Sequence, residues 1–141
     1  MLFPKKVKYR KWHTMRRNVG KIHSETRGVK LSFGSFGLKA MTIGRVRSNQ
    51  IEAARKVVSR SIGKLGKMWI RVFPDFPYTG KPAEVGMGKG KGDLQGYQFE
   101  VRPGRIIFEV DGIPEKEARN ALRKAGAKLP VKTRIVSRLE N

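Results

Sequence analysis

Apolar residues recur at helical spacing in the middle of the chain and predict a first helix. They lie three or four residues apart and would form one buried face: Ile51, Ala54, Val58, Ile62 and Leu65. Asn49 suits the N-cap position, and Glu52, three residues later, completes the pattern of a capping box. Gly63 and Gly66 provide a stop for this helix.

A second helix is predicted near the C-terminus. Pro114 fits its first position, and Glu115 and Glu117 favour a helix N-terminus because of the helix dipole. Gly126 and Pro130 would end it. The apolar face would comprise Ala118, Ala121, Leu122, Ala125 and Leu129.

Alternating apolar and polar positions predict strands elsewhere. Residues 29–47 suggest short strands broken by glycine, in which the Phe33–Gly37 segment either turns and packs or presents Phe36 for stacking, the first role being favoured. Further strands are predicted over 68–73, 97–101, 106–110 and 131–138, with a Pro103–Gly104 turn joining two of them as a hairpin. Residues 76–96 are rich in proline, glycine and lysine and predict a long loop.

This order of elements predicts an α+β fold, with two helices packed on one face of a mainly antiparallel sheet. We expect a basic N-terminal arm over residues 1–28 and a single domain over residues 29–141, with the loop at about 76–96. The length allows one modest core. No apolar run is long enough to span a membrane, and we expect the chain to be soluble and retained whole.

The charge balance points to a polyanionic partner. The chain has 141 residues, of which 32 are Lys or Arg and 11 are Asp or Glu, giving a formal net charge of +21. Residues 1–74 contain 19 of the basic residues and two acids, Glu25 and Glu52. Such a self-repelling chain is typically matched by nucleic-acid phosphates, and the first half should face them more consistently.

The N-terminal arm interleaves basic and aromatic side chains. It could be a solvated, disordered tail, but the presence of Trp favours an arm that folds against RNA, with Trp12 and Tyr9 either stacking on bases or packing on the domain. The candidate RNA-binding residues here are Lys5, Lys6, Lys8, Arg10, Lys11, Trp12, His13, Arg16 and Arg17. A basic face on the first helix adds Lys56, Arg60, Lys64 and Lys67, for which an RNA-facing role is favoured over a merely solvated one.

A glycine–lysine segment is the most distinctive part of the long loop. Glycines alternate with Met87, Lys89 and Lys91 from Gly86 to Gly92, so the backbone can approach another surface closely. The pattern is not a P-loop, because each lysine precedes glycine rather than Ser or Thr, and it lacks the dinucleotide-binding spacing. The candidate contact residues are Lys81, Gly86, Met87, Gly88, Lys89, Gly90, Lys91 and Gly92.

Enzyme chemistry is not indicated. There is no cysteine and only two histidines, so we expect neither a zinc site nor any other cofactor. No nucleophile is paired with a base. We expect most acids on exposed faces of the last strands and second helix, which disfavours a catalytic carboxylate pair.

Several blocks in order make the chain resemble the bacterial large-subunit ribosomal protein L-sixteen family. They are Pro4–Lys6 with Arg10–Lys11, Phe33–Ala40, Gln50–Arg55, Trp69–Asp75, Lys81–Pro82, Met87–Gly92, Pro103–Gly112, Lys128–Pro130 and Lys132–Thr133. An arginine usually precedes the Met-Gly-Lys segment in this family, where this chain has Gly86. The segment that follows the loop, Gly96–Phe99, also differs from this family, in which two aromatic residues are common at that place.

The resemblance implies a structural protein of the large subunit, bound to its ribosomal RNA and neighbouring ribosomal proteins. It implies that the loop reaches A-site transfer RNA near the peptidyl-transferase region, with the P site as the alternative. A bacterial cytoplasmic ribosome is expected, an organellar one being the alternative, and no membrane or homo-oligomer is expected. The rival interpretations are an RNA chaperone or DNA-compacting protein and a phosphate-handling enzyme.

Overall fold

The computed structural model describes residues 1–14, 21–88 and 90–139. The candidate residues Arg16, Arg17 and Lys89 lie outside these ranges. Within them the chain forms two helices and seven strands, and every strand pair is antiparallel, as the α+β prediction requires. The strands divide into two sheets, whereas the sequence suggested one.

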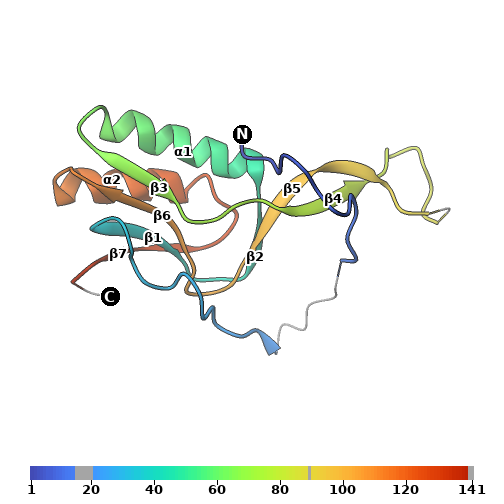
Figure 1. The fold of residues 1–141 in the computed structure, drawn as a ribbon, viewed down its shortest axis with the longest axis horizontal. Coiled ribbons are helices and arrows are strands. Elements are labelled where there is room, and N and C mark those ends of the chain that lie inside the picture. Colours follow the sequence, from blue (N-terminus) through green and yellow to red (C-terminus); the bar gives the residue numbers. More distant parts are fainter. Residues whose placement is uncertain (15–20, 89, 140–141) are drawn as a thin grey trace.

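The first sheet has four strands in the order β3-β6-β1-β7 (Figure 1). These strands are β3 (Lys67–Ile70), β6 (Ile106–Asp111), β1 (Phe36–Ala40) and β7 (Thr133–Ser137). Phe36 and Leu38 on β1 lie opposite Val110 and Phe108 on β6, so one face of the sheet is apolar. Just before β1 the backbone at Gly34 lies so close to Val110 that only glycine fits, because a Cβ there would lie 2.6 Å from the Val110 carbonyl oxygen.

Two helices, α1 (Ser48–Ile62) and α2 (Glu115–Gly126), pack against each other and cover this apolar face (Figure 1). Their predicted apolar positions are buried, with one exception. Leu65 lies beyond the end of α1 and is 89% exposed, because Gly63 adopts φ 62° and ends the helix one turn earlier. The core therefore lies between the helix pair and the four-stranded sheet.

The starts of both helices differ slightly from the prediction. Arg47, not Asn49, is the N-cap of α1, and its backbone N–H donates to the Gln50 side-chain carbonyl at 2.9 Å. Gln50 thus takes the role expected of Glu52, whose carboxylate binds Arg55 instead. The second helix begins at Glu115, with Pro114 as its N-cap.

The second sheet has three strands in the order β2-β5-β4, namely β2 (Gly44–Arg47), β5 (Asp93–Val101) and β4 (Phe76–Gly80). Two predictions are wrong here. The long loop covers only residues 81–92, because 76–80 and 93–96 belong to strands. The expected hairpin does not form: the turn at Pro103–Gly104 exists, but β5 and β6 enter different sheets.

The predicted strand over 68–73 is shorter than expected and ends at Ile70. Arg71 still donates its backbone N–H to the Ile107 carbonyl, but Val72 and Pro74 continue as buried, irregular chain. This segment links the four-stranded sheet to the three-stranded one. The final strand is likewise limited to 133–137 of the expected 131–138.

Candidate nucleic-acid interface

The N-terminal arm is attached to the domain at its first residues. The Met1 ammonium lies 4.0 Å from a Glu52 carboxylate oxygen on α1, and Leu2 packs against the core. The Phe3 ring meets Tyr97 of β5 edge to face, with ring centroids 6.1 Å apart. Leu2 thus connects the start of the arm to the hydrophobic core.

The arm then reaches the base of the long loop. Trp12 packs edge to face on Phe76 of β4, with ring centroids 5.1 Å apart. The Lys91 ammonium at the end of the loop donates a hydrogen bond to the Trp12 carbonyl. Figure 1 shows the dark-blue arm passing close to β4 and β5. Residues 1–14 thus lie along the three-stranded sheet rather than forming a detached tail.

The arm's polar side chains remain available to a partner. All of its predicted candidates within the described ranges are exposed: Lys5, Lys6, Lys8, Arg10, Lys11, Trp12 and His13. Trp12 keeps 39% of its surface exposed despite its contact with Phe76. The Lys8 ammonium lies 5.7 Å from the Tyr9 ring centroid, a cation–π contact at the surface.

The predicted basic helix face is smaller than the sequence suggested. Lys56 and Arg60 are exposed on α1, but Lys64 lies in the turn after the helix and Lys67 begins β3, so the four do not share one helical face. All four are exposed. Glu52 stands four residues before Lys56, so the helix also carries an acid near this face.

Glu52 is largely committed to another partner. Its carboxylate binds the Arg55 guanidinium through two hydrogen bonds, of 2.5 and 3.0 Å. This hydrogen bonding lowers the pKa of Glu52 below its usual 4.5. Lys56 and Arg60 therefore remain a positive pair on the surface of α1.

The glycine–lysine loop over residues 81–92 extends from the end of the β4–β5 pair (Figure 1). Lys81, Gly86, Met87, Gly88, Gly90 and Lys91 are exposed. Gly88 and Gly90 have φ values of 95° and 100°, and nothing lies within 4 Å of a Cβ built on either. Gly92 differs, because a Cβ there would lie 2.6 Å from the Gly80 carbonyl oxygen. Gly88 and Gly90 thus allow the positive φ values at the tip of the loop, and Gly92 allows the two ends of the loop to approach each other at its base.

Sequence reasoning missed a set of arginines stacked on aromatic rings of the three-stranded sheet. The guanidinium carbon of Arg45 lies 5.1 Å from the Phe76 ring centroid, and that of Arg47 lies 4.7 Å from the Tyr78 centroid. Arg45 and Arg47 alternate along β2, as do Phe76 and Tyr78 along β4. Their period of two was a usable signal, hidden because 76–80 was interpreted as loop.

A buried acid was also missed. Glu109 of β6 is fully buried, contrary to the expectation that the acids of the last strands are exposed. Its carboxylate accepts hydrogen bonds from the backbone N–H groups of Ser32, Phe33 and Gly34 and from Arg71. This organises the segment before β1 and gives Glu109 a structural role.

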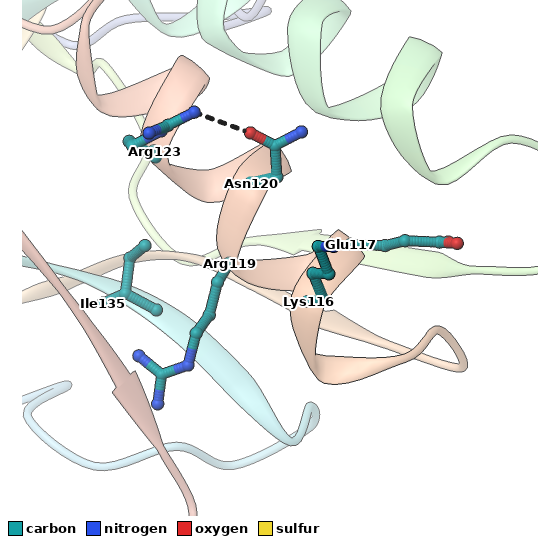
Figure 2. A pocket seen from close by; sticks show the side chains of 6 residues that line it. All are labelled: Lys116, Glu117, Arg119, Asn120, Arg123 and Ile135. Carbon is teal, nitrogen blue, oxygen red and sulfur yellow. Dashed lines mark hydrogen bonds between the residues drawn. The ribbon is translucent and has the colours of Figure 1, made fainter.

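A groove with a volume of about 620 Å³ lies between α2 and β7 (Figure 2). Its two arginines have partners: Arg119 binds Glu115 at 2.9 Å, and Arg123 donates to Asn120 at 2.9 Å. The third lining cation, Lys116, is exposed on the surface of α2. Figure 2 shows Arg119 leaving the helix on the side where Ile135 lies, whereas Glu117 points away from it. We interpret this groove as ordinary charged surface.

Other kinds of site find no support in the described part of the chain. No cluster of three or more His, Cys, Asp or Glu residues there is arranged to hold a metal ion. Neither α1 nor α2 has the length and apolar character needed to cross a membrane.

Comparison with known proteins decides the family. The sequence model of the family described as ribosomal protein L16p/L10e matches residues 4–136, nearly the whole chain. The chain belongs to this family. Two curated relatives named large ribosomal subunit protein uL16, from two strains of Caulobacter vibrioides, are each 51% identical to it over 141 residues. Each match covers 99% of this chain and 95% of the relative.

Proposed function

We propose that the chain is a structural constituent of the large ribosomal subunit that binds ribosomal RNA and contacts transfer RNA through its 81–92 loop. Membership of the L16p/L10e family supports the ribosomal role, and we propose that this role is structural rather than enzymatic. The Caulobacter relatives support a bacterial large subunit in the cytoplasm. Ribosomal RNA and neighbouring ribosomal proteins are the partners in this setting.

The observation that carries the transfer-RNA part is the form of the loop. It extends from a two-stranded base, exposes Lys81 and Lys91, and carries glycines with positive φ at its tip. Such a segment buries almost no apolar surface, so a partner must compensate its ordering entropy. We propose A-site transfer RNA as that partner, with P-site transfer RNA as the alternative. Gly86 leaves the tip without the arginine usual in the family, so Lys89 and Lys91 would supply its positive charge.

The arm and the surface of α1 would bind ribosomal RNA. The exposed cations of residues 5–11, with Lys56, Arg60, Lys64 and Lys67, are suited to phosphate contacts. Trp12 has a partly exposed ring that can meet a base, while Phe76 fixes its position. An RNA chaperone or a DNA-compacting protein would share the charge but not the family match over residues 4–136.

The decisive experiment removes the two lysines of the glycine–lysine segment and leaves its glycines in place. Large subunits would be reconstituted with the Lys89→Ala, Lys91→Ala variant, and A-site and P-site transfer-RNA affinities measured. We expect normal assembly with weaker A-site binding. The matched control, Lys116→Ala with Lys124→Ala, removes two exposed cations from α2 and should leave transfer-RNA binding unchanged.

A second variant tests the loop backbone. Gly88→Ala with Gly90→Ala adds no clash but places alanine at positive φ, so it should distort the loop alone. Gly92→Ala is avoided because its Cβ would strike the Gly80 carbonyl and disturb the strand pair. Wild-type transfer-RNA affinity in both loop variants would show that the loop is a passive connector.

A further inference from the structure

A polar cleft of about 480 Å³ lies where the 81–92 loop leaves the three-stranded sheet. Its lining includes Arg47 from the end of β2, Tyr78 from β4, Lys81 from the loop and Gln95 from β5. None of its lining residues is acidic. The cleft therefore combines side chains of all three strands with one loop cation.

Tyr78 and Arg47 form the wall of this cleft. Tyr78 pairs with Gly96 in the strand register, and a Cβ on Gly96 would lie 3.0 Å from the Tyr78 hydroxyl oxygen. Gly96 thus leaves the room in which the tyrosine ring lies against β5. The Arg47 guanidinium is held over that ring, with its central carbon 4.7 Å from the centroid. Stacking fixes the plane of a guanidinium but leaves its edge N–H groups free to donate.

The two cations of the cleft retain unused donors. Among the described residues, neither Arg47 nor Lys81 forms an ion pair. The Lys81 ammonium gives one hydrogen bond to the Gly88 carbonyl and keeps two further N–H donors. A guanidinium fork beside an ammonium, with no carboxylate in the lining, suits a phosphate oxygen pair.

We propose that this cleft binds an RNA phosphodiester, with Arg47 donating through its guanidinium edge and Lys81 through its ammonium. This inference rests on the proposed ribosomal function. It adds Arg47, Tyr78 and Gln95, none of which the sequence suggested, to the RNA-contacting surface. Arg45, stacked on Phe76 two residues earlier on β2, is paired with Glu100 at 3.7 Å, so Arg47 and Lys81 are the cations offered to the phosphodiester. The phosphodiester belongs either to ribosomal RNA or to transfer RNA.

The test compares two double variants of the full chain. Arg47→Gln with Lys81→Gln removes both cations of the cleft, and Lys116→Gln with Lys124→Gln removes two exposed cations from α2. Each is titrated against large-subunit core particles that lack this protein, over a range of salt concentrations. Loss of charge-assisted hydrogen bonds should weaken the cleft variant roughly tenfold to a hundredfold. The magnitude of its salt slope should fall by about 0.7–0.9 for each phosphate that the variant no longer neutralises.

Tyr78 provides a second, independent readout. Tyr78→Leu keeps an apolar side chain between the strands but removes the ring that orients Arg47. We expect it to weaken binding less than the double variant, and to have no further effect once Arg47 is Gln. Arg47 and Lys81 are both exposed, so we expect their replacement to leave the fold intact. Circular dichroism and urea unfolding check that each variant is folded.

The outcomes distinguish the RNA and separate this inference from the proposed function. Weaker binding of the cleft variant to core particles supports a ribosomal-RNA phosphate. Normal binding followed by weaker transfer-RNA affinity in the reconstituted ribosome supports a transfer-RNA phosphate. If the wild-type chain binds core particles and the cleft variant matches the α2 control in both assays, the inference is overturned and the proposed function stands. Failure of the wild-type chain to bind would overturn the proposed function, and this inference with it.

Discussion

The carboxylate of Glu109 accepts a hydrogen bond from the Arg71 guanidinium at 2.7 Å, while Glu109 itself is fully buried. The same carboxylate accepts three backbone N–H groups from residues 32–34. Arg71 in turn lies over the Phe33 ring, 5.2 Å from its centroid, and Phe33 stacks on Trp69. One acid thus joins β3, β6 and the segment before β1.

Replacing Glu109 should therefore destabilise the fold strongly. Glu109→Ala leaves a partly buried arginine and three backbone donors without their acceptor, a change that typically costs about 3–5 kcal/mol. Urea unfolding of the free chain measures this loss. Glu117→Ala, an exposed acid on α2, is the control and should change stability by less than about 0.5 kcal/mol. Equal stability of the two variants would contradict the structural role.

The Glu52–Arg55 pair should make stability depend on pH in the acid range. The pKa of Glu52 is lower in the folded chain than its usual value of 4.5. At a pH above the pKa of the unfolded chain, the ionised carboxylate therefore stabilises the fold. That contribution is lost as the pH falls through the lower folded pKa. Between pH 7 and pH 3 the wild type should lose more unfolding free energy than Glu52→Gln, which cannot titrate. Parallel pH profiles of the two proteins would show that the pair contributes nothing.

The exposed cations of α1 should contribute to RNA affinity without affecting the fold. Lys56→Gln with Arg60→Gln removes both charges and avoids placing a new acid four residues after Glu52. We expect native circular dichroism, weaker binding to large-subunit RNA and a reduced salt slope. Lys124→Gln with Lys128→Gln removes equal charge from the last turn of α2 and the residues that follow it. If both variants bind alike, the α1 surface is merely solvated.

Trp12 should fix the arm and, through it, the base of the loop. Trp12→Ala removes the edge-to-face contact with Phe76, a contact worth about 0.5–1.5 kcal/mol beyond its buried area. We expect faster amide hydrogen exchange in the arm and at Lys91, whose ammonium binds the Trp12 carbonyl. Tyr9→Ala is the matched control, since Tyr9 is 63% exposed. If amide exchange at Lys91 is unchanged in the Trp12→Ala variant, the packing of Trp12 does not help to fix the base of the loop.

The sequence predicted the helices best, because the apolar periods of α1 and α2 are set by packing against one sheet. Their burial at Ile51, Val58 and Leu122 is confirmed, and Leu65 fails because Gly63 ends the helix first. The pairing of strands was harder to predict from the sequence. The turn at Pro103–Gly104 is local and was predicted, but whether β5 pairs with β6 depends on β1 and β2, which are distant in sequence.

The candidate site shows the same division. Exposed cations of the arm and the tip glycines follow from composition, and most of them are exposed in the structure. The alternation of Arg45 with Arg47 and of Phe76 with Tyr78 is a local signal, but the contact of Arg47 with Tyr78 depends on β2 and β4 lying on either side of β5, which the sequence does not reveal. Glu109 was misjudged because its burial results from a segment more than 70 residues away that covers it.

The position of β1 has a consequence for folding during synthesis. This early strand lies between β6 and β7, which are the last two strands to be translated. Both edges of β1 therefore stay unpaired until nearly the whole chain has left the ribosome that makes it, and unpaired edges are prone to wrong associations. Non-local pairing of this kind is also slow. The nascent chain thus spends most of its synthesis without its central sheet, and a product truncated before residue 133 would retain an open edge.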